Sequence, residues 1–75
     1  MFFRTTADEQ LDGMAAMFAD DLGPYEVTIE APSLEAALAF IEEYNLEEAS
    51  SWSDTRTFLS PLVECVDAPG EYHLA

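Results

Sequence analysis

The sequence predicts a small α+β domain, with an antiparallel or mixed sheet and two helices packed on one face of it. Three observations lead to this fold class. One segment alternates apolar and polar residues as a strand does, two others repeat apolar residues at helical spacing, and apolar residues make up 49% of the chain. Its 75 residues are enough for one domain and too few for two, so we expect a single domain over residues 1–75.

The first third of the chain predicts a strand followed by a helix. Residues 2–5 are apolar and β-prone, and we expect a short strand there. Thr6 and Glu9 are spaced as a capping box at the start of a helix over 7–22. The apolar face of this helix is formed by Leu11, Met14, Ala15, Phe18 and Leu22. The Gly-Pro pair at 23–24 is typical of a helix end.

The middle of the chain predicts a second strand and a second helix. Strict alternation over 25–31 indicates a half-buried strand, which Pro32 ends. Ser33 is a suitable N-cap for a helix over 34–45, in which Asn45 is the closing residue. The expected buried stripe consists of Leu34, Ala37, Leu38 and Ile41, widened by Phe40 and Tyr44.

The last third predicts strands. Residues 55–59 suit a strand, although Ser53, Asp54 and Thr55 also fit the cap of a short helix. The β-prone segment 62–67 is followed by a turn at 68–71 with a Pro-Gly pair in the positions that a type II turn requires. Residues 71–74 are then expected to return as the second strand of a hairpin.

Charge is the most unusual property of the sequence. Sixteen Asp and Glu residues accompany two Arg and no Lys, for a net charge of −14. Like charges at this density repel one another and destabilise the folded state. Direct binding to nucleic acid or to an anionic membrane is disfavoured, because both carry negative charge. The partner that this charge fits is a positively charged protein surface.

Helical and strand periodicity places many of these acids away from the apolar faces. The candidate partner-binding residues are Glu9, Asp12, Asp20, Glu26, Glu30, Glu35, Glu42, Glu43, Glu47 and Glu48. Carboxylates one or two helical turns apart are separated by about 5 to 11 Å, so a row of them can imitate the phosphates of a nucleic acid. Apolar anchors would add selectivity. The candidates are Met17, Phe40, Tyr44 and Trp52, for which core packing is the alternative role.

Catalytic and metal-binding patterns are weak, and we expect neither an enzyme nor a cofactor. Cys65 and His73 are the only cysteine and histidine, and a pair across the expected hairpin would have no third group to orient it. The acids at 8, 9 and 12, or at 20 and 21, do not follow a calcium-loop pattern, so we expect no specific metal. The N-terminal residues lack the apolar core of a signal peptide, and no apolar run reaches about 20 residues. These features favour a cytoplasmic monomer.

In its size, its lack of Lys and its acidic segment Ser33-Leu34-Glu35-Ala36-Ala37-Leu38-Ala39-Phe40-Ile41-Glu42-Glu43-Tyr44, the chain resembles the small acidic inhibitors that phages use against bacterial defence. These include anti-CRISPR proteins and antirestriction DNA mimics. The resemblance implies a protein that occupies the DNA- or guide-binding groove of a CRISPR surveillance complex or a restriction-type enzyme, in the host cytoplasm. It assigns no site residue.

Three other readings of the sequence stay open. An antitoxin or immunity protein that neutralises a basic nuclease would need the same negative surface. A housekeeping domain adapted to high salt would use the acids for solubility. A small acidic enzyme or metal-binding domain is the least favoured reading.

Overall fold

The ten-residue strand β1 (Phe2–Leu11) lies at the centre of the sheet in the computed structural model, which describes residues 1–11, 24–51 and 55–74. On one edge β1 pairs antiparallel with β2 (Tyr25–Glu30), from Phe2 opposite Glu30 to Ala7 opposite Tyr25. On its other edge it pairs antiparallel with β3 (Thr55–Leu59) and, nearer the N-terminus, with β4 (Glu64–Val66). Two strands therefore share one edge of β1.

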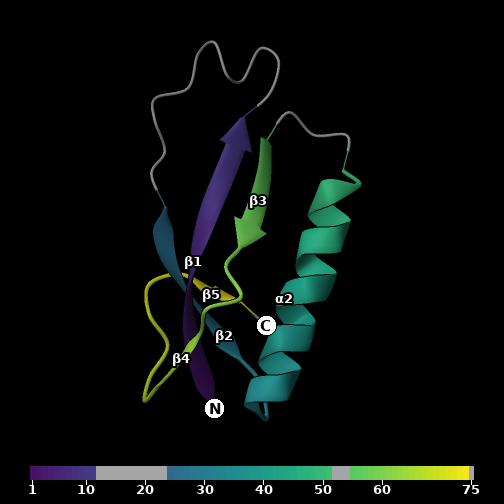
Figure 1. Cartoon of the computed structure of the whole chain (residues 1–75). Helices are drawn as coiled ribbons and strands as arrows, with labels where there is room; N and C mark the ends of the chain where they lie inside the picture. Colours follow the sequence, from purple (N-terminus) through teal and green to yellow (C-terminus); the bar gives the residue numbers. More distant parts are fainter. Residues whose placement is uncertain (12–23, 52–54, 75) are drawn as a thin grey trace.

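The helix α2 (Leu34–Ala49) covers one face of this sheet, and β5 (His73–Leu74) adds a parallel strand beside β2 (Figure 1). The strand order is β3-β1-β2-β5, with β4 beside β1. The expected α+β class is confirmed, and the sheet is of the mixed type. The expectation of two helices on one face is not matched, because α2 is the one helix within the described residues.

The predicted helix over 7–22 is wrong at its start, because β1 continues to Leu11. Residues 7–11 pair with β3 from Ala7 opposite Leu59 to Leu11 opposite Thr55. These backbone hydrogen bonds outweigh the local capping-box signal of Thr6 and Glu9, as tertiary pairing often outweighs local preference. The rest of that predicted helix lies outside the described residues.

The predicted C-terminal hairpin is also wrong. β4 and β5 do not pair with each other, since β4 lies beside β1 and β5 lies beside β2. The connection between them crosses the sheet on the face opposite α2. There the amide of Gly70 donates to the hydroxyl of Thr28 at 2.8 Å, and Thr28 is buried although it belongs to the polar face of β2. A Cβ at position 70 would lie 3.1 Å from the Thr28 hydroxyl, so glycine permits this close approach.

The strands over 25–31 and 55–59 are confirmed as β2 and β3. The second helix is confirmed and is four residues longer than expected, ending at Ala49. Ser33 is its N-cap, and the side chain accepts a hydrogen bond from the amide of Ala36 at 3.1 Å. Asn45 lies inside the helix and does not close it.

The buried stripe of α2 is rotated from the predicted one. Ala37 and Ile41 are buried, while Leu34 and Leu38 are 50% and 39% exposed. The stripe continues instead through the partly buried Tyr44, Asn45 and Glu48. It packs against two apolar clusters of the sheet, one around Ala7, Val27, Ile29 and Leu59 and the other around Phe3 and Ala31.

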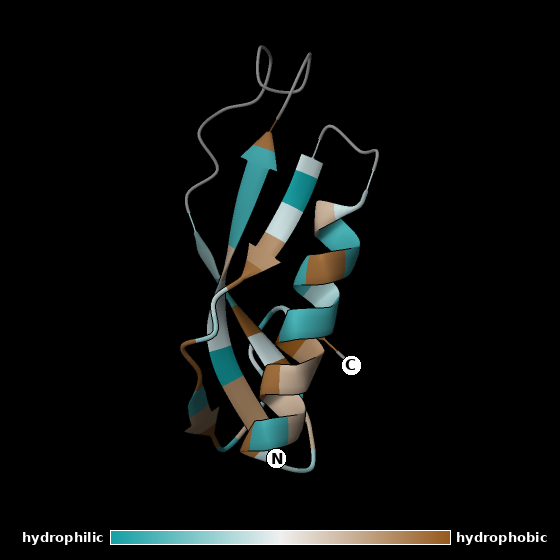
Figure 2. Ribbon diagram, turned by 45° about the vertical axis from the view of Figure 1, so that its right-hand side comes forward, coloured by the Kyte–Doolittle hydropathy of each residue, from teal (hydrophilic) through white to brown (hydrophobic). Residues whose placement is uncertain are grey.

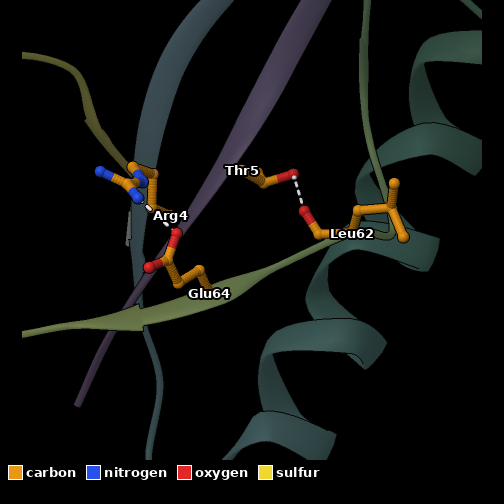
Figure 3. A network of polar contacts seen from close by, with 4 residues as sticks. All are labelled: Arg4, Thr5, Leu62 and Glu64. Atoms are coloured by element: carbon orange, nitrogen blue, oxygen red, sulfur yellow. Dashed lines mark hydrogen bonds and ion pairs between the residues drawn. The ribbon is translucent and has the colours of Figure 1, made fainter.

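A break separates β3 from β4 at Ser60–Val63, where Pro61 cannot donate a ladder hydrogen bond. The buried hydroxyl of Thr5 lies opposite this break. It contacts the carbonyl oxygens of Ser60 at 2.7 Å and Leu62 at 3.1 Å, and Figure 3 shows the second of these contacts. One β1 side chain therefore provides polar contacts where the ladder is interrupted.

Asn45 connects α2 to the outer edge of β3. Its side-chain amide donates to the carbonyl of Leu59 at 2.9 Å, and its carbonyl oxygen accepts from the amide of Leu59 at 2.8 Å. The side chain thus pairs with the edge strand as a neighbouring strand would, which protects this position of the edge from further pairing.

We expect Asn45→Ala to lower the free energy of unfolding by about 1–2 kcal/mol. Two hydrogen bonds are lost, each with a net value of about 0.5–1.5 kcal/mol, and the better helix preference of Ala offsets part of the loss. Urea denaturation measures the change. Leu46→Ala, at a site that is 65% exposed on the same helix, is the matched control and should change stability by less than about 0.5 kcal/mol. Equal effects of the two variants would contradict this role of Asn45.

Candidate functional site

The exposed side of α2 carries four carboxylates, those of Glu35, Glu42, Glu43 and Glu47, and we call it the helix acid face. Glu35 and Glu42 are seven residues apart and lie on one row, at a separation of about 10 Å along the axis. Glu43 and Glu47 form a second row, about 6 Å apart. No basic residue occurs in the helix. Figure 2 shows hydrophilic bands alternating with hydrophobic ones along α2.

Apolar side chains lie between these carboxylates. Leu38 follows Glu35 by three residues and precedes Glu42 by four, and Leu46 follows Glu42 by four. Residues at these spacings are neighbours on a helix surface. Leu38 is 39% and Leu46 is 65% exposed, so the helix acid face presents leucines beside acids.

A second group of acids lies on the opposite side of the molecule. Glu26 and Glu30 are exposed on the face of β2 that points away from α2, and we call this the sheet acid face. Two basic side chains lie close to acids on this side of the molecule. Arg4 forms an ion pair with Glu64 (Figure 3), and His73 Nε2 lies 3.6 Å from Glu30 Oε2. The hydrogen bond and charge of Glu64, with the charge of Glu26, raise the pKa of Arg4.

The ten predicted binding residues therefore do not form one surface. Four lie on the helix acid face, and Glu26 and Glu30 lie across the sheet from them. Glu9 of β1 and Glu48 of α2 are both partly buried between the sheet and the helix. The expectation that Glu9 projects away from the apolar residues is therefore wrong. Asp12 and Asp20 lie outside the described residues.

The four predicted apolar anchors also separate. Met17 and Trp52 lie outside the described residues. Phe40 and Tyr44 are partly buried and pack against the core, with ring centroids 6.0 Å apart. Phe40 and Tyr44, with Glu43 and Glu47, line a hollow of about 170 Å³ at the border of the helix acid face.

A tyrosine cluster was not predicted from the sequence. The hydroxyl of Tyr25 lies 3.5 Å from Glu9 Oε1, and the rings of Tyr25 and Tyr72 meet edge to face with centroids 5.2 Å apart. Burial and, next, the charge of Glu9 raise the pKa of Tyr25. Burial and, next, the charge of Glu48 raise the pKa of Tyr44. Alternation places Tyr25 on the apolar face of its strand, and helical spacing places Tyr44 beside the apolar stripe of α2. Only the tertiary structure brings these two tyrosines close to Tyr72.

The possible catalytic and metal-binding residues are not assembled. Cys65 lies on β4 and His73 on β5, and β1 and β2 separate these strands by about 14 Å. Asp8 and Glu9 are consecutive in a strand and point to opposite faces of the sheet. Asp20 and Asp21 lie outside the described residues. Within the described ranges, no three potential metal ligands come together.

Comparison with known protein families, curated proteins and solved structures gave no match. In the part of the chain that the structure describes, no helix is long and apolar enough to span a membrane.

Raised tyrosine pKa values predict a loss of stability in alkaline solution. As pH rises through about 10, the unfolded chain loses its tyrosine protons before Tyr25 and Tyr44 do so in the folded protein. The free energy of unfolding should be unaffected by these groups below pH 10 and should fall above it. In Tyr72→Phe, where only these two tyrosines titrate, the phenolate absorbance should rise with a midpoint above 10. A midpoint at or below 10 would contradict the assignment.

Repulsion among the acids predicts stabilisation by salt. Monovalent salt screens exposed charges over a distance of about 10 Å at 0.1 M, so sodium chloride should raise the Tm. Thermal unfolding followed by circular dichroism, from low salt to about 0.5 M, measures the effect. The double variant Glu43→Gln and Glu47→Gln should have a higher Tm at low salt and a smaller response. A Tm that does not change with salt would contradict the view that net repulsion acts in the folded state.

Proposed function

We propose that the protein binds the positively charged nucleic-acid-binding groove of a partner protein through the helix acid face of α2, and that it inhibits the partner by occupying this groove. One observation carries the proposal. A 16-residue helix carries four exposed carboxylates, no basic residue, and exposed leucines between the acids. The proposal assigns no catalytic residue to the chain.

Electrostatics supplies the attraction. A negative surface steers a basic groove towards it, increases the association rate and makes the rate depend strongly on salt. The axial spacings of about 6 and 10 Å between acids correspond to about two and three phosphates along one strand of a duplex, which are about 3.4 Å apart along the axis. On binding, the carboxylates take the place of the counterions or phosphates that the groove otherwise holds.

Leucines supply the selectivity that charge lacks. Leu38 and Leu46 are exposed next to Glu42, so a groove that closes over this carboxylate also covers apolar side chains. Apolar contacts at the centre of an interface, surrounded by polar ones, carry much of the energy in protein complexes. This arrangement favours a protein partner over diffuse binding of cations.

Exposed carboxylates on both outer faces favour a second candidate function, that of a domain adapted to high salt. Glu26 and Glu30 lie across the sheet from α2. A single groove therefore cannot contact the sheet acid face and the helix acid face at the same time. Acids on every side would keep the chain soluble in concentrated salt. Folding at low salt separates the two candidates: a chain that folds only in molar potassium chloride favours this second function and opposes inhibition.

A pair of charge-matched variants tests the inhibitor function. The immobilised protein is incubated with bacterial lysate at low and at high salt, and the retained complex is assayed for binding to its own nucleic acid. We expect one defined basic complex, retained at low salt, whose nucleic-acid binding the added protein prevents. Glu35→Gln with Glu42→Gln should weaken binding at least fivefold, because both carboxylates face the groove.

Glu26→Gln with Glu30→Gln is the matched control, since it changes the net charge equally on the opposite face. It should weaken binding less than twofold. Equal losses in the two double variants would mean that only total charge matters and would contradict a specific helix interface. A retained complex that still binds its nucleic acid would contradict inhibition.

A further inference from the structure

A cavity of about 320 Å³ lies between α2 and the sheet face that α2 covers, and it is separate from the helix acid face. Tyr25, Tyr44 and Tyr72 contribute aromatic rings to its wall, while Val27 and Leu59 contribute apolar surface from the sheet. This volume is at the small end of the range for ligand sites in proteins, so it suits a small group rather than a large cofactor. We call it the tyrosine pocket.

The rings come from three different elements of the fold. Tyr25 begins β2, Tyr44 projects from α2, and Tyr72 immediately precedes β5. The planes of Tyr25 and Tyr72 differ by 61°, so these two rings form walls that meet at an angle. Tyr44 is supported by Phe40 on its own helix. An angled set of aromatic walls is the arrangement that binds alkylated ammonium groups in other proteins.

The surroundings of the pocket are negative. Glu71 lines the cavity, Glu9 lies 3.5 Å from the Tyr25 hydroxyl, and the charge of Glu48 acts on Tyr44. The residues that line the pocket include neither Arg nor Lys, and its one histidine, His73, has its Nε2 atom 3.6 Å from Glu30 Oε2. Carboxylates beside aromatic rings favour a cation over a neutral molecule and oppose an anion. One lining carboxylate with phenol groups does not provide the six or more oxygen ligands that a calcium ion takes.

We propose that the tyrosine pocket is a binding site for an alkylammonium cation, held against the rings of Tyr25, Tyr44 and Tyr72 and beside the carboxylate of Glu71. The lysine head group and small quaternary ammonium compounds both belong to this class. The site depends on residues other than those of the helix acid face, so it stands independently of the inhibitor function.

Choline is the first probe, and its neutral isostere, with a tert-butyl group in place of trimethylammonium, is the control ligand. Both are titrated into the full chain at constant ionic strength, and the amide and tyrosine ring resonances are followed by NMR. We expect saturable shifts of the pocket residues with choline and at least fivefold weaker binding of the isostere. Equal binding of choline and its neutral isostere would overturn the proposal, because the positive charge would then contribute nothing.

Tyr72 is 54% exposed, so we expect substitutions at this position to leave the fold intact. Tyr72→Leu keeps an apolar group but removes the ring, and it should weaken choline binding about two- to tenfold. Tyr72→Phe keeps the ring and should bind within twofold of the unmodified chain. Glu71→Gln should also weaken binding. Undiminished binding in Tyr72→Leu, with shifts spread along α2, would show diffuse attraction to acids and would overturn the site.

A third titration, with N-acetyl-lysine methylamide, identifies the source of the cation. Tighter binding of the lysine derivative than of choline would assign the pocket to a lysine side chain of a partner protein. Tighter binding of choline would assign it to a free quaternary ammonium compound. Either result supports an alkylammonium site, whereas failure of both ligands overturns it.

Discussion

The pairing of β1 on both of its edges is the constraint on which the rest of the structure depends. Its ten residues hold β2 on one side and both β3 and β4 on the other. Because β1 stays extended as far as Leu11, its side chains alternate between the face that α2 covers and the opposite face. Ala7, the pairing partner of both Tyr25 and Leu59, is fully buried at this junction, where α2 packs through Ile41.

A sheet with a helix on one side divides the charge of the molecule into two separate surfaces. The sheet acid face has nearby basic groups, since Arg4 pairs with Glu64 and His73 lies close to Glu30. The helix acid face combines its carboxylates with exposed leucines instead. The two surfaces therefore differ in chemistry although their charge has the same sign, and this difference favours α2 as the side that meets a partner.

The tyrosine pocket shows how a two-residue strand can shape a site. β5 pairs in parallel with β2, placing Leu74 opposite Ile29, and the amide of Thr28 donates to the carbonyl of Tyr72. This pairing brings the ring of Tyr72 against Tyr25. A C-terminal hairpin with β4, as the turn residues suggested, would have placed Tyr72 on the other edge of the sheet, away from Tyr25.

The sequence by itself determined the α+β class, β2, the Ser33 cap and most of α2, because these features follow from alternation, helical spacing and local hydrogen bonding. It favoured a strand at β3 but left a short helix open. It also determined the negative charge and the acids that α2 exposes. Only the tertiary structure decided that residues 7–11 form a strand and that β5 joins β2. Both outcomes depend on hydrogen bonds to segments distant in the sequence, which local patterns do not encode. The separation of the ten predicted acids and the meeting of the three tyrosines have the same cause, since each depends on which strands become neighbours.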